Sequence, residues 1–196
     1  QFASAKKIQS ATAFITTHGM YEAHINGKRV GDAYLTPGWT SYAKRLQYQA
    51  YDVKALLENG ANCIGVTVGS GWFRTPLGWE TNKELYGRKL ALLLQLEITY
   101  TDGSHTTIAS DETWKSSNGA IRSSEMYNGE VYNANNDKKG WSLATYSDRD
   151  WPGVTVKDYS KNVLVATYNQ PVRKHETFPA VRMFTTPAGE KVIDFG

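Results

Sequence analysis

The sequence has a single cysteine, no long apolar run and no block of like charges, and each absence excludes a class of protein. Cys63 has no partner, so no disulfide can form within the chain, and cytoplasmic, periplasmic and secreted locations all stay open. The longest apolar run, Leu90–Leu94, is far below the roughly 20 residues of a membrane-spanning helix. The net charge is only +3, which gives little electrostatic support for nucleic acid or a membrane surface as a partner.

What the chain does contain is strand-like alternation. All even positions of Leu90–Tyr100 are apolar, whereas the odd positions from Gln95 onwards are polar, which predicts a half-buried strand. Asp102-Gly103 predicts a two-residue hairpin turn, with a return strand at Thr106–Ala109. Further strands are predicted at Ala11–Thr17, Tyr21–Ile25, Lys28–Val30, Leu46–Tyr51, Asn62–Val68, Ile121–Ser124, Gly129–Ala134 and Val154–Lys157.

Helical patterning is nearly absent. One short stretch has the signals of a helix, with Asp52 as the N-cap, Val53–Leu57 as a turn or two and Asn59-Gly60 as the stop. Many short strands joined by turns predict an all-β fold of the β-sandwich or jelly-roll type.

The alternation breaks at Ser160–Val172 and resumes in strand-like patches after Pro171. This pattern predicts two units, because domain boundaries fall where regular structure is interrupted by polar, proline-containing segments. We expect a β-sandwich at residues 1–170, and at 171–196 a linker and the start of a second β-domain.

A longer break, Gly69–Gly87, is too irregular for a strand. Loops of this length are usually functional or disordered, and the aromatic residues here argue against disorder. Indole rings suit stacking on the C–H face of a sugar, so the segment is a candidate surface for carbohydrate or for a neighbouring domain. Packing on its own domain is an equally weighted alternative, and Trp39 fits either role. The candidate contact residues in the segment are Trp72, Arg74, Trp79 and Tyr86.

No catalytic motif is found. In Gly69-Ser70-Gly71 a glycine directly follows the serine, which does not fit the nucleophile elbow of hydrolases. The four histidines lack the spacing of zinc ligands, and His24 is predicted on the solvated face of its hairpin. Glu125 and Glu130 are close in sequence, but nothing directs them into a shared pocket, so we interpret them as exposed carboxylates.

Asn133, Asn135 and Asp137 have the alternate spacing of oxygen ligands at the start of a calcium-binding loop. An EF-hand is excluded, because Lys138 stands where the glycine is needed and Ala144 where the closing glutamate is needed. A sandwich-type calcium site at the three residues is the weaker alternative to plain surface side chains.

Several long motifs, in order over Ala11–Val156, resemble the N-terminal accessory domain of bacterial α-L-rhamnosidases. The last residues, Pro171–Arg173 and Val192–Gly196, resemble the start of the next β-domain of the same enzymes. The motifs that carry the resemblance are Gly19–Gly31, Leu35–Tyr42, Tyr48–Val53, Gly69–Arg74, Tyr86-Gly87, Ser110–Trp114, Tyr127–Tyr132 and Gly140–Ser142.

The resemblance implies a jelly-roll sandwich like the galactose-binding domain. It also implies a parent enzyme that releases terminal α-L-rhamnose from glycosides by inversion, with acidic catalytic residues in a later (α/α)₆ barrel. No catalytic residue is carried over, so the chain alone is predicted to be inactive, with rhamnosyl glycosides and its own downstream catalytic domain as partners. Some relatives bind rhamnose through this module with calcium, so calcium is the one candidate cofactor that the resemblance implies.

The run Tyr127–Tyr132 adds Glu130 and Tyr132 to the candidate contacts with carbohydrate or with the catalytic domain. It also departs from the family, because Asn128 and Asn133 replace acidic residues and Asn135 replaces an arginine. Three hypotheses follow from the sequence: a non-catalytic module that shapes the substrate cleft, an independent rhamnose- or oligosaccharide-binding module, and a structural spacer.

Overall fold

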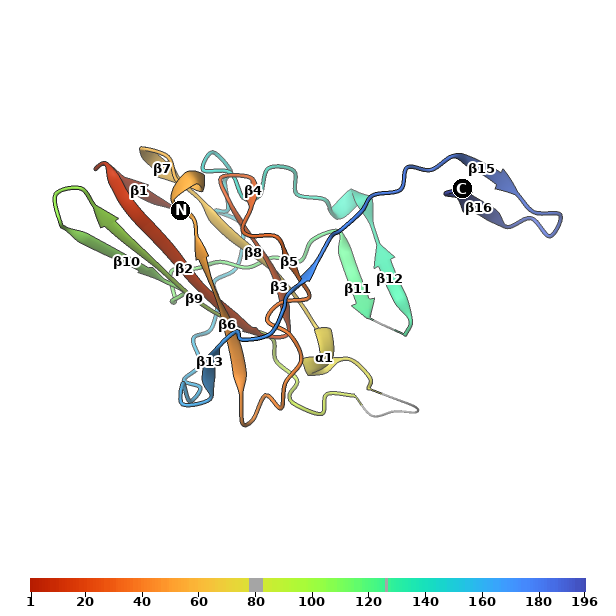
Figure 1. Ribbon diagram of the computed structural model, residues 1–196, viewed down its shortest axis with the longest axis horizontal. Coiled ribbons are helices and arrows are strands. Elements are labelled where there is room, and N and C mark those ends of the chain that lie inside the picture. The colour runs from red at the N-terminus through yellow and green to blue at the C-terminus, as the bar shows by residue number, and fades with distance from the viewer. Residues whose placement is uncertain (78–82, 126) are drawn as a thin grey trace.

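Strands form most of the regular structure in the computed structural model, which describes residues 1–77, 83–125 and 127–196 (Figure 1). The candidate residue Trp79 lies outside the described residues. The described helices are the short turns η1 (Lys54–Leu56), α1 (Gly71–Arg74) and η2 (Ala134–Asn136). None of them is long and apolar enough to cross a membrane.

The first layer is a five-stranded sheet in the order β10-β9-β2-β6-β13. The long central strand β2 pairs antiparallel with β9 on one side and with β6 on the other, whereas β13 joins β6 in parallel. The predicted hairpin across Asp102-Gly103 is confirmed as β9 and β10. The strands are β2 (Ile8–His18), β6 (Leu46–Asp52), β9 (Ala91–Tyr100), β10 (His105–Ala109) and β13 (Leu164–Ala166).

The second layer is a three-stranded sheet in the order β4-β3-β8, made of β3 (Met20–Ile25), β4 (Lys28–Arg29) and β8 (Ile64–Gly69). Its hairpin turns at Asn26-Gly27, as the sequence predicts. Both residues have the left-handed backbone that such turns need, with φ of 51° and 80°. Four two-stranded pairs complete the structure: β1 (Phe2–Ser4) with β7 (Gly60–Asn62), β5 (Ala33–Tyr34) with β14 (Val172–Arg173), β11 (Ile121–Glu125) with β12 (Gly129–Tyr132), and β15 (Arg182–Thr185) with β16 (Lys191–Asp194).

The larger of two core clusters among the described residues joins the two layers. Ile15, Leu94 and Leu96 come from the five-stranded sheet, Ala23 and Ile25 come from the three-stranded sheet, and each is at most 1% exposed. Burying one such leucine or isoleucine side chain contributes roughly 1.5–3 kcal/mol. The all-β sandwich predicted from the alternation is therefore confirmed.

Two predictions of local structure are wrong. Val154–Lys157 forms no strand and Val156 is 58% exposed, because only an isolated bridge from Gly153 to Lys115 reaches this segment. The segment Ser160–Val172, interpreted as a break, contains β13, whose partner β6 lies far away in sequence and left no local signal.

The prediction that His24 lies on a solvated face is wrong. The Trp141 ring lies edge-on to its imidazole at a centroid distance of 5.6 Å. Burial lowers the pKa of His24, although the neighbouring Glu22 raises it. The Trp141 ring can pack here only because residue 65 is glycine, since a Cβ at Gly65 would stand 2.3 Å from the ring. Alternation predicted which face His24 occupies, but not the distant side chain that covers that face.

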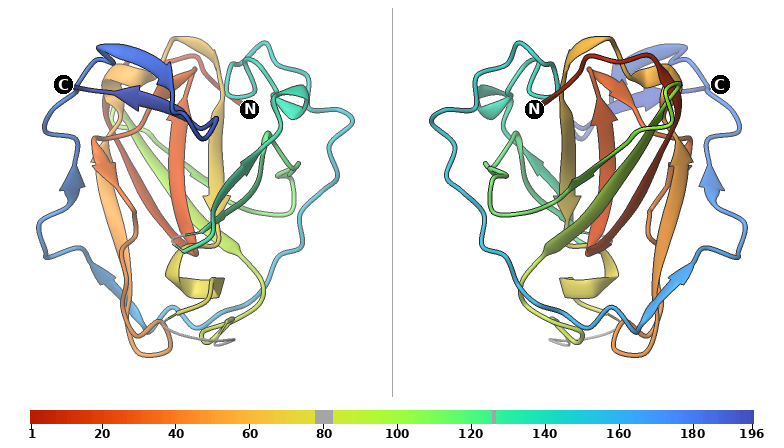
Figure 2. Two further views of the ribbon diagram at one scale, coloured as in Figure 1. Left: turned by 90° about the vertical axis from the view of Figure 1, so that its right-hand side faces the viewer. Right: turned by 90° about the vertical axis from the view of Figure 1, so that its left-hand side faces the viewer.

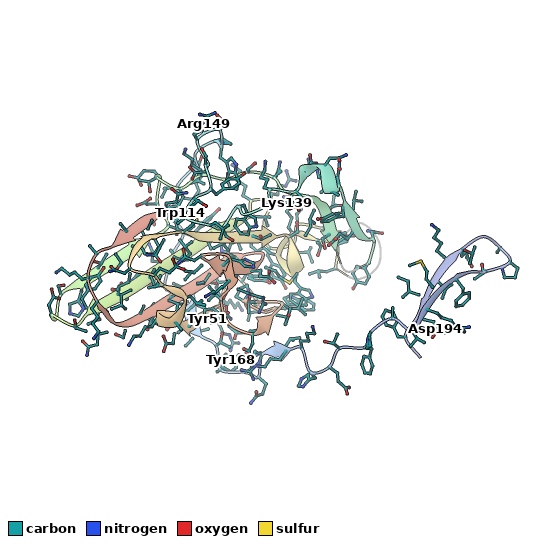
Figure 3. The ribbon with its side chains drawn as sticks, turned by 90° about the horizontal axis from the view of Figure 1, so that it is seen from above. Tyr51, Trp114, Lys139, Arg149, Tyr168 and Asp194 are labelled. Atoms are coloured by element: carbon teal, nitrogen blue, oxygen red, sulfur yellow. The ribbon has the colours of Figure 1, made fainter. Side chains whose placement is uncertain are left out.

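The C-terminal segment first runs along the sandwich and then leaves it. β14 pairs with β5, and Arg173 Nε lies 2.8 Å from the Asp32 carboxylate. Beyond β14 the chain extends away to the hairpin β15–β16 (Figure 1), and Asp194 lies well apart from Tyr51 and Trp114 of the sandwich (Figure 3).

Candidate functional site

The candidate Trp72 lies in α1, at one end of the sandwich where β8 finishes (Figure 2). Glycines allow this turn of helix to follow the strand so closely. A Cβ at Gly19 would stand 2.3 Å from the Gly69 carbonyl oxygen, and a Cβ at Gly71 would stand 2.4 Å from the Met20 side chain. Gly71 also has a φ of +48°, in the left-handed region that favours glycine. The passage from β8 into α1 therefore requires residues without a Cβ at Gly19 and Gly71.

Trp72 stacks on Trp39, and the two indole planes are nearly parallel. Their centroids are 6.0 Å apart with an interplanar angle of 4°. Trp39 Nε1 donates a hydrogen bond of 3.3 Å to the Tyr86 hydroxyl. We call Trp39, Trp72 and Tyr86 the aromatic platform. Trp39 is 53% exposed, so the platform presents an indole surface to solvent.

A small apolar cluster packs against the buried side of the aromatic platform. Phe73, the next residue of α1, is 3% exposed and packs edge-on against Tyr42 at 5.3 Å. Tyr42 also meets Tyr86 edge-on at 4.9 Å, and burial raises the pKa of its phenol. The Tyr42 hydroxyl donates to the Gly38 carbonyl at 3.2 Å, which holds the backbone next to Trp39. The platform is thus attached to this small apolar cluster at two points, Phe73 and Tyr42.

An open groove of about 180 Å³ lies beside Trp39 and Trp72. One of its walls is the chain that leads from β13 to β14. Gln49 anchors this wall, because its side-chain amide donates to the Pro37 carbonyl at 3.2 Å and to the Thr167 hydroxyl at 2.7 Å. Among the described residues the lining carries no charge, and it consists of Tyr34, Leu35, Thr36, Pro37, Gly38, Trp39, Gln49, Trp72, Thr167, Asn169, Gln170, Pro171 and Val172.

Arg74 turns toward Glu84 rather than into the groove. Its Nε lies 3.9 Å from a Glu84 carboxylate oxygen, and Arg88 Nε lies 3.0 Å from the other oxygen. The backbone N–H of Glu84 donates to the Arg74 carbonyl at 3.1 Å. Exposed ion pairs of this kind add little stability, so their main effect is to hold the residues before Tyr86 against α1.

Glu130 and Tyr132 are exposed on β12, in a hairpin separate from the aromatic platform. Glu130 faces Ser124 across the hairpin and Tyr132 faces Ile121. Among the described residues, ring stacking and a hydrogen bond join Trp72 and Tyr86 through Trp39, but no such contact joins either of them to Glu130 or Tyr132. The structure therefore brings together part of the predicted set, and it adds Trp39.

The three calcium candidates surround η2. The Asn133 side chain accepts a hydrogen bond of 3.1 Å from the backbone N–H of Asn135, which is an ordinary capping contact. Asn135 and Asp137 belong to the same turn, where the Asp137 N–H donates to the Ala134 carbonyl. Across residues 1–77, 83–125 and 127–196, no group of three or more His, Cys, Asp or Glu side chains could hold a metal ion.

Comparison with known proteins identifies this architecture. The family model for the "Alpha-L-rhamnosidase N-terminal domain" matches residues 6–176. The chain belongs to this family. The matched range includes both layers of the sandwich and the three residues of the aromatic platform.

Individual relatives of this N-terminal domain are much longer proteins. It is 38% identical over 192 residues to an α-L-rhamnosidase of Streptomyces avermitilis, a match that covers 97% of this chain and 18% of the relative. A solved α-L-rhamnosidase from Aspergillus terreus matches at 41% identity and a TM-score of 0.93, over 99% of this chain and 23% of that chain. A solved α-L-rhamnosidase from Streptomyces avermitilis, in complex with L-rhamnose, matches at 38% identity and a TM-score of 0.91, over 99% of this chain and 19% of that chain.

Proposed function

We propose that this domain is a non-catalytic accessory module of an α-L-rhamnosidase, and that its aromatic platform borders the substrate cleft formed by a catalytic domain elsewhere in the protein. The observation that carries the proposal is the half-exposed Trp39, held parallel to Trp72 and hydrogen-bonded to Tyr86. An indole face pre-positioned in this way suits the apolar face of a sugar ring, since little ordering is needed on binding. The family context supports a rhamnosyl glycoside as the substrate.

Changing both Trp39 and Trp72 to alanine in the full-length protein is expected to lower kcat/KM for an aryl α-L-rhamnoside about tenfold, because stacking is lost. Trp151→Ala is the matched control, since Trp151 packs against Tyr146 and lies outside the platform. The 196-residue chain assayed alone is expected to show no turnover. An unchanged kcat/KM in the double variant would support a structural spacer instead.

The groove beside Trp39 favours a second candidate function, an independent rhamnose- or oligosaccharide-binding module. Its uncharged lining, with an exposed indole and the amides of Asn169 and Gln170, suits a neutral sugar. Titration calorimetry of the 196-residue chain with L-rhamnose, with and without calcium, separates the two functions. Heat of binding that disappears in Trp39→Ala supports the independent module, whereas no heat under either condition leaves the cleft-bordering role.

We further propose that residues 171–196 are a linker and the first hairpin of a second β-domain. The two faces of β15–β16 differ. On one face Arg182 pairs with Asp194 at 2.8 Å and lies over the Phe184 ring at 5.0 Å. The other face leaves Met183 and Ile193 opposite each other and at least half exposed. An isolated two-stranded hairpin is marginally stable in water, so an open apolar face suits further strands of the same domain.

A further inference from the structure

A continuous series of ring contacts runs from His18, at the end of β2, to the aromatic platform. His18 stacks on Phe73 with a centroid distance of 4.7 Å and an interplanar angle of 9°. Phe73 then meets Tyr42, and Tyr42 meets Tyr86, whose hydroxyl accepts the hydrogen bond from Trp39. Phe73 is also the direct neighbour of Trp72 in α1. Both indoles of the platform therefore depend on rings that His18 supports.

The environment of His18 suits a neutral imidazole and not a charged one. Its Nδ1 is buried and has no hydrogen-bond partner among the residues the structure describes. The ionisable group in contact with the ring is the Tyr159 phenol, which meets it edge-on at 4.7 Å. No carboxylate or cation of the described residues pairs with it, and Phe73 from α1 and Ala91 from β9 face it without charge. Burial lowers the pKa of His18 from its ordinary 6.5.

We propose that His18 is a positioning residue of the aromatic platform, and that it holds Phe73 and Trp72 in place only while its imidazole is neutral. Protonation would create a charged ring whose buried nitrogen becomes a donor without an acceptor, which costs free energy. Rotation of the ring out of the stack into water removes that cost. Phe73 then loses its stacked partner, and α1 loses the contact that fixes Trp72.

The direction of the pH effect follows from linkage. A histidine that binds a proton less readily in the packed state than in water binds more protons once it has left the stack. Lowering the pH below 6.5 therefore favours the displaced state, and raising it restores the platform. A stacked ring without a titrating group would show no such dependence. The consequence for sugar recognition rests on the proposed function, but the coupling itself does not.

The test is an NMR titration of the uniformly ¹⁵N-labelled chain from pH 8 to pH 5, followed at the indole Nε1–H resonances. The Trp39 and Trp72 resonances are assigned with Trp39→Phe and Trp72→Phe. Because the Trp39 indole N–H is bonded to Tyr86, its resonance reports the geometry of the platform. We expect it to shift with a single midpoint below 6.5, matching the midpoint of the His18 ring resonance.

Three variants make the result decisive. His18→Phe keeps a stacked ring without a titrating group, so the Trp39 resonance is expected to stay at its high-pH position throughout. His18→Gln, which has no ring, is expected to shift it to the displaced position at every pH. His24→Gln removes the other half-buried histidine and is expected to leave the titration intact. A titration that persists in His18→Phe, or a Trp39 resonance that stays fixed while His18 titrates, overturns the proposal. Neither readout uses sugar or activity, so failure of the proposed function would be seen separately.

Discussion

Replacing Gly19 by alanine is expected to destabilise the domain by about 2–4 kcal/mol, from backbone strain and overpacking together. The new Cβ would stand 2.3 Å from the Gly69 carbonyl oxygen, and Gly19 has a φ of +133°, which L side chains rarely adopt. The clash is with backbone, so no rotamer change relieves it, and β3 must move away from the end of β8. For a domain of this size the midpoint of thermal unfolding should fall by about 10 °C, as measured by circular dichroism.

The matched control is Gly69→Ala, on the other side of the same contact. A Cβ at Gly69 would meet nothing within 4 Å, and this residue has no positive φ. The substitution is therefore expected to change the unfolding free energy by less than about 1 kcal/mol. Equal losses in the two variants would show that the close approach of Gly19 is not what limits the substitution. Since α1 follows Gly69, Gly19→Ala should also shift the Trp72 indole resonance.

The strands that the sequence predicts correctly are those whose signal is local. β9 and β10 follow from alternation on either side of Asp102-Gly103, and β3 and β4 follow from alternation on either side of Asn26-Gly27. β13 has no such signal, because its three residues are held by parallel pairing with the distant β6. Val154–Lys157 fails in the opposite way. Its apolar and polar residues alternate, but a strand also needs a neighbouring strand to pair with, and the local sequence does not show whether one is there.

The candidate site shows the same division between local and distant causes. Trp72 and Tyr86 were predicted because a long aromatic loop is visible in the sequence itself. Trp39 could not be assigned to either role, because its stacking on Trp72 and its hydrogen bond to Tyr86 join three separate segments. His18 gave no sequence signal as a support, since its position below the platform depends on where Gly19 and Gly69 place α1.

The contact between Gly65 and Trp141 predicts that a side chain at position 65 lowers the stability of the domain and also changes the pKa of His24. A Cβ at Gly65 would stand 2.3 Å from Trp141 Cζ3 and 2.9 Å from Cε3, so the indole has to leave the face of β8. Gly65→Ala is therefore expected to cost about 1–3 kcal/mol of stability, the range seen for overpacking. It should also expose His24 and raise its pKa toward the ordinary value of 6.5, because burial is the main cause of the lowering.

A double-mutant cycle separates this clash from any general effect of alanine in the strand. Trp141→Ala alone removes the ring and its packing on His24, and is expected to be destabilising. Once the indole is gone, the three atoms nearest to the new Cβ are removed, so Gly65→Ala should cost much less. The two changes should therefore be less than additive, with a coupling of about 1–3 kcal/mol in denaturant unfolding. If Gly65→Ala costs the same with and without Trp141, the indole is not the reason that β8 carries a glycine at this position.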